Sequence, residues 1–584
     1  MKKLIIIFCF VSTIICCQEK ANTSSQRIAS DVGDYLDINN IKASVEASSI
    51  LNRGDSWNYP QGFEFPKGSK KFSAGASGVW VAGINDWGQL KVAAQTYGLG
   101  EYDFGPGPLN NGDASISFDL IQKYNYVWKI SYTDINDFIT NYNNRNIQYN
   151  AYTPKADLLN LPTELIDNWE THQPFAKYID HNNDGKYNPK TDGDYPNIKG
   201  DQALYYVFND NSSFHSASGG GAIGLQVNAI AYAYGCPKVV EGRKELLNTT
   251  FYNYKLYNRS NNKLNQAYIS IWVDGNIGNG QDDYVGSNPK KGYAYAYNGD
   301  GNDAVYGNIL PATGTVILKA PKAPLNDSID NDYDGIIDEI DEELLKPNIF
   351  YFNHAPFGSI GGVVNSDPQN AIQTYEYMTG KWRDGTQFTC GGDAYGGTTS
   401  TNEVFPGINA TSTVCALSNW TEKNVGNIPG DRCYLLSLGP FTFNAHDSTE
   451  IEFAFVTSVD SSAVGNTDGS VAKLENDIIK VKNFYNLPIK PNCIIDINQI
   501  PEKVINNSLT IYPNPSNDLM TFSSLSFINR KTILYIHDLL GKKIAEYILT
   551  EFSNTIDISS YSKGMYFASV DINNKTITQK IIKE

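Results

Sequence analysis

The sequence predicts a mostly β protein built of antiparallel β-sandwich domains, with few short helices and a small β-sandwich at the C-terminus. Short stretches of alternating apolar and polar residues, bounded by glycine, asparagine, aspartate and proline, recur along the chain. Helical periodicity is confined to residues 158–169 and 470–485. Aromatic residues make up 12% of the chain, which excludes a largely disordered protein.

The charge of the chain bears on its partners. The formal net charge is −17, because 63 acidic residues outnumber 46 basic residues. A protein that binds nucleic acid needs a basic face to neutralise phosphates, so we expect no nucleic-acid partner.

The N-terminus predicts a signal peptide in residues 1–17. Lys2 and Lys3 precede an apolar run that ends near Cys17 and is too short for a transmembrane helix, so cleavage is expected after this cysteine. The alternative is a lipoprotein acylated at Cys17, although residues 14–16 lack the usual small residue before the cysteine. No other apolar run approaches the ~18 residues that a membrane span needs, so we expect no transmembrane span after removal of the signal.

The body of the protein is expected to consist of an N-terminal β-rich region, residues 18–150, and a main β-sandwich region, residues 201–493. The segment 151–200 between them combines a helix with an acidic loop. Strand-like alternation is clearest in five stretches, which are residues 74–94, 251–273, 315–318, 349–352 and 451–456.

Several stretches of the body resemble large uncharacterised secreted proteins of Bacteroidetes. The resemblance covers about residues 40–486 and implies a fold but no reaction. It is carried by residues 80–83, 104–109, 272–274, 282–286, 430–432 and 439–441.

An acidic loop at residues 330–341, within an insertion at residues 326–343, predicts a calcium site. Calcium takes about six to eight oxygen ligands, and acids at positions 1, 3, 5, 9 and 12 of a loop can converge on one ion. The loop has Gly335 at position 6, where the chain must turn, and Ile337 at position 8, which we expect to anchor the loop on the core. The predicted ligands are the side chains of Asp330, Asp332, Asp334, Asp338 and Asp341 and the carbonyl of Ile336.

This loop resembles the helix-poor calcium loops of thrombospondin type 3 repeats, which implies bound Ca²⁺. It departs from the helix-flanked calcium loop at Asp341, where a bidentate glutamate is usual, and Glu342 follows as a substitute. The alternative is a solvated acidic linker.

A second, less complete loop begins at Asp180 and has Gly185 at position 6. Thr191 stands at position 12, so the closing carboxylate is expected from Asp192 or Asp194 after a small shift in register. The predicted ligands are Asp180, Asn182, Asp184, the carbonyl of Lys186 and Asp192.

Two further acidic clusters are more typical of ordinary turns, so we predict no ion at either cluster taken singly. One comprises Asp274, Asn276, Asp282 and Asp283, and the other comprises Asp300, Asn302 and Asp303.

Residues 508–584 are predicted to form a separate small β-sandwich, preceded by a linker at residues 494–507. Four landmarks occur in order, which are Tyr512-Pro513-Asn514-Pro515, the Gly541-Lys542 turn, Gly564-Met565-Tyr566 and Lys580. Together they resemble the type A C-terminal sorting domain of the type IX secretion system of Bacteroidetes. The resemblance implies that the secretion machinery is a partner and that the protein is secreted or held on the outer cell surface. The alternative is an ordinary β-module without an address.

The cysteine count predicts at least one unpaired thiol, because five cysteines remain after the signal peptide. Cys390 and Cys415 flank a loop rich in glycine and threonine and are the preferred disulfide pair. Cys236 is expected to be free and buried. The other two are Cys433 and Cys493.

No catalytic motif is recognisable, so no catalytic residue is predicted. We therefore expect a calcium-stabilised surface or secreted protein that acts in adhesion or glycan binding. The alternative is a secreted polysaccharide-degrading enzyme, because a pair of carboxylates needs no fixed spacing in sequence. Glu170, Glu241 and Glu245 are available for such a pair, although nothing distinguishes them from solvated acids.

Overall fold

The computed structural model describes most of the chain between residue 32 and the C-terminus. The described residues are 32–56, 59–148, 166, 169, 176–326, 328, 330–331, 337, 342–345, 347–353, 364–407, 415, 419–487, 490–494, 509–524, 532–549, 553–572 and 575–584. The predicted signal peptide lies outside them, as does most of the helix expected at residues 158–169.

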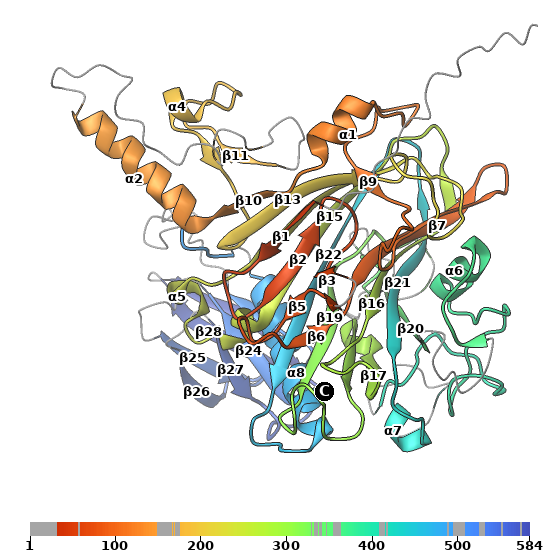
Figure 1. Ribbon diagram of the computed structural model, residues 1–584. Helices are drawn as coiled ribbons and strands as arrows, with labels where there is room; N and C mark the ends of the chain where they lie inside the picture. The colour runs from red at the N-terminus through yellow and green to blue at the C-terminus, as the bar shows by residue number, and fades with distance from the viewer. Residues whose placement is uncertain are drawn as a thin grey trace, which may run out of the picture.

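A nine-stranded antiparallel sheet forms the centre of the body (Figure 1). Its order is β10 (Trp128–Ser131), β13 (Gln202–Asn209), β14 (Leu225–Ala233), β15 (Thr249–Asn258), β22 (Ser448–Val459), β19 (Pro311–Lys319), β18 (Tyr293–Asn298) and β17 (Asp283–Asn288), and β9 (Gly105–Pro106) also pairs with β13.

Smaller sheets cover one face of this large sheet. The five-stranded sheet has the order β20 (Asn348–Asn353), β21 (Arg432–Phe443), β16 (Leu264–Asp274), β7 (Ser77–Asn85) and β8 (Leu90–Ala94). A four-stranded sheet comprises β1 (Gly33–Leu36), β2 (Lys42–Glu46), β5 (Phe63–Glu64) and β6 (Phe72–Ala74). Two separate short hairpins pair β3 (Arg53–Ser56) with β4 (Tyr59–Gln61) and β11 (Tyr178–Ile179) with β12 (Tyr195–Pro196), and Tyr195 of the second hairpin packs on the opposite side of the large sheet.

The main core lies between the large sheet and these smaller sheets. Trp80 and Trp272 stack with their ring centroids 6.4 Å apart, and both side chains are buried. From the large sheet, Tyr252 stacks on Phe453 at 5.2 Å. Aromatic side chains of this size contribute the most apolar area to a core, so these rings hold the layers together.

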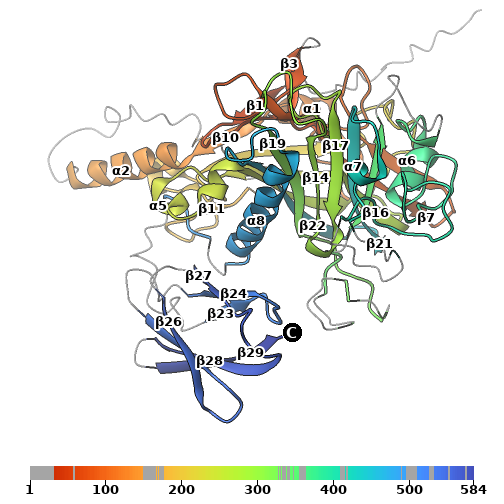
Figure 2. The same cartoon turned by 90° about the horizontal axis from the view of Figure 1, so that it is seen from below.

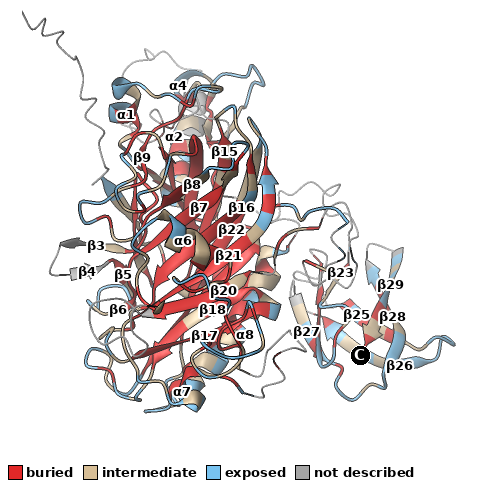
Figure 3. Ribbon diagram, turned by 90° about the vertical axis from the view of Figure 1, so that its right-hand side faces the viewer, coloured by how far each residue is buried: buried red, intermediate tan, exposed pale blue. Residues whose placement is uncertain are grey.

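A second core covers the opposite face of the large sheet, where α8 (Thr467–Tyr485) packs across β19 and β22 (Figure 2). Leu474, Ile478 and Val481 of this helix are fully buried. The helix predicted at residues 470–485 is therefore confirmed. Because both faces of the large sheet are covered, every residue of β13 and β14 is buried. The strand β22 of the same sheet is mostly buried too and is red over most of its length in Figure 3.

The helix α2 (Tyr132–Gln148) departs from the prediction, which confined helical periodicity to two other stretches. Its apolar face is carried by Ile135, Phe138, Ile139 and Tyr142, which contact the second core. The other helices are short: α1 (Phe118–Tyr124), α4 (Pro189–Asp192), α5 (Pro237–Val240), α6 (Ala371–Met378) and α7 (Glu422–Val425), with 3-10 helices η1 (Lys244–Asn248) and η2 (Pro289–Lys291). Within the described residues, no helix combines the length and apolar character needed to cross a bilayer.

The C-terminal residues form two further sheets around a core of their own (Figure 2). One sheet comprises β23 (Thr510–Tyr512), β24 (Leu519–Ser523) and β27 (Ser553–Asp557). The other has the order β26 (Lys543–Leu549), β25 (Thr532–His537), β28 (Gly564–Ile572) and β29 (Lys575–Lys583). The predicted fold class, antiparallel β-sandwiches with few helices and a small C-terminal sandwich, is confirmed.

Candidate functional sites

The loop that begins at Asp180 has a tightly ordered turn. The Asp180 Oδ2 atom accepts the N–H of Gly185 at 2.8 Å, and Asn182 Oδ1 accepts the N–H of Asp184 at 3.0 Å. Gly185 has a φ of 74°, which supplies the sharp turn expected at position 6. The Asp180 Oδ1 atom is shielded from solvent and has no hydrogen-bond partner. The loop therefore holds acceptor atoms of its first, third and fifth positions around one short turn.

The closing carboxylate of this loop was expected from Asp192 or Asp194. Asp194 is fully buried, and its two oxygens accept the N–H groups of His181 and Asn188 at 3.0 and 2.8 Å. Asp194 thus fastens the two ends of the loop together. Asp192 lies half-buried at the last position of α4. The carbonyl of Lys186 and the Asp192 carboxylate remain predicted ligands.

The 330–341 loop lies mostly outside the described residues, which contain only Asp330, Asn331 and Ile337 of it. The predicted ligands Asp332, Asp334, Ile336, Asp338 and Asp341 are not among them. Ile337 is 57% exposed, so the expectation that it anchors the loop on the core is wrong. The anchor is instead Glu342, which is buried and accepts the N–H of Asn331. The loop is therefore anchored by a hydrogen bond to the Glu342 carboxylate, and not by apolar packing of Ile337.

The two further acidic clusters, expected to be separate turns, lie together at one end of the body. The Asn279 N–H, in the loop between β16 and β17, donates to Asp303 Oδ2 at 2.7 Å. The Gly299 N–H, after β18, donates to the carbonyl of Asp282 at 2.7 Å. The pairing of β17 with β18 brings about this convergence, which neither cluster could reveal singly.

Exposed aromatic side chains occur on two loops that adjoin β8. Trp87, at the tip of the hairpin that joins β7 and β8, is 73% exposed, and Phe214, in the loop between β13 and β14, is 67% exposed. His215 fixes that loop against β8, because its Nδ1 lies 2.7 Å from the carbonyl oxygen of Val92. The exposed aromatic rings are thus carried by loops that are tied to the sheet.

The acids considered for a catalytic pair lie in different surroundings. Glu245 is buried in η1, and burial raises its pKa above the ordinary value. Glu241 is exposed at the end of α5. Glu170 lies outside the described residues.

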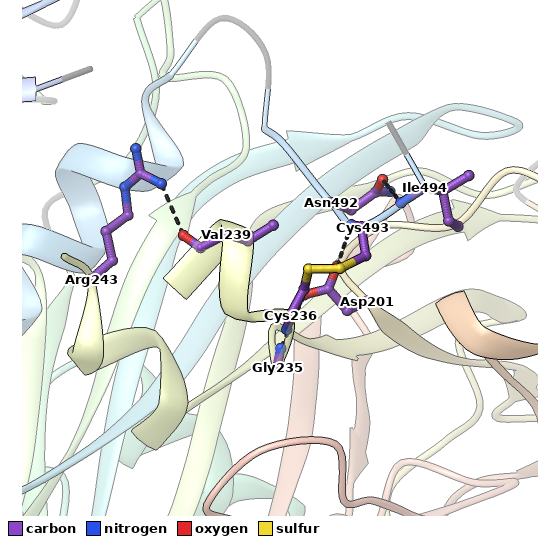
Figure 4. Close-up of a disulfide and its surroundings, with 8 residues drawn as sticks. All are labelled: Asp201, Gly235, Cys236, Val239, Arg243, Asn492, Cys493 and Ile494. Atoms are coloured by element: carbon purple, nitrogen blue, oxygen red, sulfur yellow. Dashed lines mark hydrogen bonds between the residues drawn. A yellow bond between two sulfur atoms is a disulfide. The ribbon is translucent and has the colours of Figure 1, made fainter. Parts of the chain in front are cut away.

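Two disulfides form within the described part of the chain. The predicted bond between Cys390 and Cys415 is confirmed. The prediction that Cys236 is a free thiol is wrong, because Cys236 bonds to Cys493, 257 residues further along the chain (Figure 4). Among the described cysteines, Cys433 is the free one; it is buried, and burial raises the pKa of its thiol well above the ordinary value.

Asp201 lies against the Cys236–Cys493 bond (Figure 4). Its carboxylate accepts the N–H groups of Gly235, Cys236 and Cys493 at 3.0, 2.9 and 2.8 Å. Among the described residues, only Asp201 and these two cysteines place three acidic, thiol or imidazole ligand atoms within 4.8 Å of one another. Because both sulfur atoms are used in the disulfide, we assign this group a structural role.

The landmarks of the C-terminal sandwich have identifiable structural roles. Asn514, within the Tyr512–Pro515 stretch, donates to the carbonyl of Lys580 at 2.9 Å and accepts the N–H of Ile582 at 2.8 Å. The turn at Gly541 is closed by Asp538, whose Oδ1 accepts the N–H groups of Leu540 and Lys542 at 2.9 Å each. The first and last landmarks therefore clamp the end of the chain to the beginning of the sandwich.

Comparison with known proteins agrees with this arrangement. Residues 510–584 match the family described as the secretion system C-terminal sorting domain. No curated protein matches the chain. One solved structure, a polysaccharide lyase, is 8% identical over 61% of this chain and 34% of its own length, with a TM-score of 0.17, and at that score the likeness carries no argument. The C-terminal part of the chain is a type IX sorting domain, which directs the protein to the cell surface or the extracellular space.

Proposed function

We propose that the exported protein is a calcium-stabilised binding protein that contacts glycans at the end of the body where β7 and β8 meet. The observation that carries this proposal is the exposure of Trp87. A tryptophan is highly buried on average, so a ring that is 73% exposed on a short turn is unusual. The apolar face of an aromatic ring can stack on the apolar face of a sugar ring.

The turn that carries Trp87 is well ordered, which favours binding. Asn85 Oδ1 accepts the N–H groups of Trp87 and Gln89 at 3.1 and 2.9 Å. Asp86 pairs with Lys263 at 3.5 Å, which ties the turn to the neighbouring connection between β15 and β16. Little conformational entropy is then lost when the ring meets a ligand.

Replacing Trp87 with alanine is expected to weaken glycan binding about 30-fold, which corresponds to the ~2 kcal/mol typical of a tryptophan at the centre of a contact. The measurement is the dissociation constant of the sorting-domain-free body for glycans first identified on an array. Trp87→Phe should retain part of the affinity. Tyr395→Ala, which removes an aromatic ring exposed on another loop, is the matched control.

Two results would contradict this proposal. Unchanged binding by Trp87→Ala would remove the ring from the contact. Release of reducing sugar by the wild-type body, with no retention of the glycan, would favour the polysaccharide-degrading enzyme.

Calcium removal is expected to lower the melting temperature of the body. The acids in the 330–341 loop repel one another, and a dication cancels this repulsion while joining the loop. A ligand at ~100 times its dissociation constant stabilises the native state by roughly 2.7 kcal/mol. Asp332→Ala combined with Asp334→Ala should abolish the response of this loop, and Asp184→Ala should abolish that of the other.

Differential scanning calorimetry with calcium and with chelator measures these responses. Asp447→Ala, which removes an exposed acid elsewhere, is the control and should keep the wild-type shift. A full calcium-dependent shift in the variant that carries all three substitutions would assign the effect to other residues.

A further inference from the structure

Three connections of the body meet around Asp283, at the start of β17. The first is the loop between β16 and β17, whose Ile277 N–H donates to Asp283 Oδ2 at 2.8 Å. The second follows β18 and contains Asp303. The third precedes β21, where the Gly430 N–H donates to the carbonyl of Asp283 at 2.9 Å. Because β16 and β21 belong to the five-stranded sheet and β17 and β18 to the large sheet, this point joins both layers.

Three side-chain oxygens at this junction are shielded from solvent and have no hydrogen-bond partner. They are Oδ1 of Asn276, Oδ1 of Asp282 and Oδ1 of Asp283, which we call the Asp283 cluster. The Asp283 side chain is fully buried, with a relative exposure of 0%. A buried carboxylate oxygen without a partner is costly, because desolvation is not offset by any protein contact.

Charge repulsion adds to this cost. Burial raises the pKa of Asp283 well above its ordinary value, and the nearby carboxylates of Asp282, Asp303 and Asp431 raise it further. Burial also raises the pKa of Asp282, as do the carboxylates of Asp303 and Asp300, while hydrogen bonds from Asn279 and Asn298 lower it. Arg432, which directly follows Asp431 in the sequence, is engaged with Glu422 at 3.1 Å.

Glycines make room for these polar groups. A Cβ atom at Gly280 would lie 2.0 Å from Asn276 Oδ1, and one at Gly278 would lie 2.2 Å from Asp303 Oδ1. Gly278 also has a φ of 61°, which favours glycine. Both carboxylate oxygens of Asp303 accept hydrogen bonds, Oδ2 from the N–H of Asn279 and Oδ1 from the N–H of Val305. Asp303 therefore fixes the conformation of the loop around the cluster.

We propose that the Asp283 cluster binds a calcium ion that joins the two sheets at this end of the body. The available donors are all oxygen atoms, which suits a hard dication and not a metal that prefers nitrogen or sulfur. At this junction the described residues hold no group of three acidic, thiol or imidazole ligand atoms within 4.8 Å of one another. The proposed shell therefore combines the carboxylate oxygens of Asp282 and Asp283 with the amide oxygen of Asn276. Carbonyl oxygens and water commonly complete such a shell. The site is separate from the loops at residues 180–192 and 330–341.

The test uses the mature full chain in a background that carries Asp184→Ala, Asp332→Ala and Asp334→Ala, so that the other two loops do not contribute. Isothermal titration with CaCl₂ is expected to retain one equivalent of bound calcium in this background. Asp282→Asn combined with Asp283→Asn should abolish that equivalent and the calcium-dependent rise in melting temperature. Asn276→Ala, a milder change in a half-buried loop residue, should weaken binding by at least about tenfold.

The control is Asp210→Asn. Asp210 is also fully buried, but its oxygens accept N–H groups from Ile223, Gly224 and Leu225, so this variant should lose stability and keep the calcium equivalent. The proposal is overturned if the background binds no calcium or if the paired asparagine variant binds it normally. The Asp282→Asn, Asp283→Asn variant could also have the same melting temperature as its background, both with and without calcium. That result would show that the two acids are held protonated in the folded protein, and it would overturn the proposal. If the pair fails to fold, unchanged binding by Asn276→Ala decides against the site.

Discussion

Cells that produce the protein without residues 508–584 are expected to retain it in the periplasm, with no detectable fraction on the surface. The sorting domain matches residues 510–584, and its chain end is clamped by Asn514 to Lys580 and Ile582, so the deletion removes the whole folded signal. Fractionation and protease accessibility on intact cells measure the effect. Because the deletion removes only the sorting domain and leaves the body intact, surface delivery is expected to be lost completely.

The matched experiment fuses residues 494–584 to an unrelated periplasmic passenger, which should then appear on the surface. Calorimetry of the truncated chain checks that the body still folds. Normal surface delivery of the truncated protein would show that the address lies elsewhere.

Replacing Arg432 with methionine is expected to cost about 3–5 kcal/mol of the free energy of unfolding, because it leaves a buried carboxylate without its cation. Glu422 is fully buried, and its Oε2 lies 3.1 Å from Arg432 Nε. Its other contacts are neutral donors, the N–H of Val285 at 2.8 Å and the amide of Asn427 at 3.1 Å. Urea unfolding of wild type and variant measures the loss.

The pH dependence of this variant has a defined sign. Burial raises the pKa of Glu422 above its ordinary value while Arg432 lowers it, so removing Arg432 raises the folded pKa further. A carboxyl whose folded pKa is raised binds more protons in the folded than in the unfolded state. The variant should therefore regain stability as the pH falls from the folded pKa towards the ordinary value. The double variant Arg432→Met with Glu422→Leu should recover much of the loss, and a single variant as stable as wild type would refute the argument.

The sequence was informative where residues follow a regular strand or helix pattern or where a loop is a local motif. The helix α8 was predictable because Leu474, Ile478 and Val481 repeat at helical spacing. The strand β13 was missed because residues 203–208 form an unbroken apolar run, whereas the mostly buried β15 was predicted because Asn253 and Lys255 alternate with its apolar residues. In α2, asparagine and β-branched residues obscure the spacing of its apolar face.

The candidate sites also differ in how far they could be predicted, according to whether their residues are close together in the sequence. The turn that begins at Asp180 is made within a few residues, so its glycine and its acceptors could be assigned from their spacing. The Asp283 cluster is different, because it depends on the pairing of β17 with β18 and on the approach of the segment before β21. The bond between Cys236 and Cys493 likewise depends on where the end of β14 and the chain after α8 meet.

That bond determines how the protein would bear a pulling force. A ligand held at Trp87 and a cell held through the C-terminal domain would load the chain from residue 87 to its end. The covalent path runs through β8, β13 and β14 to Cys236 and crosses directly to Cys493, so the intervening residues carry no tension along the chain. If the bond were reduced, 257 residues at about 3.4 Å each would enter the path, and the tether could lengthen by roughly 900 Å before it became taut. With the bond intact, the residues between Cys236 and Cys493 cannot add to the length of the chain between residue 87 and the C-terminus.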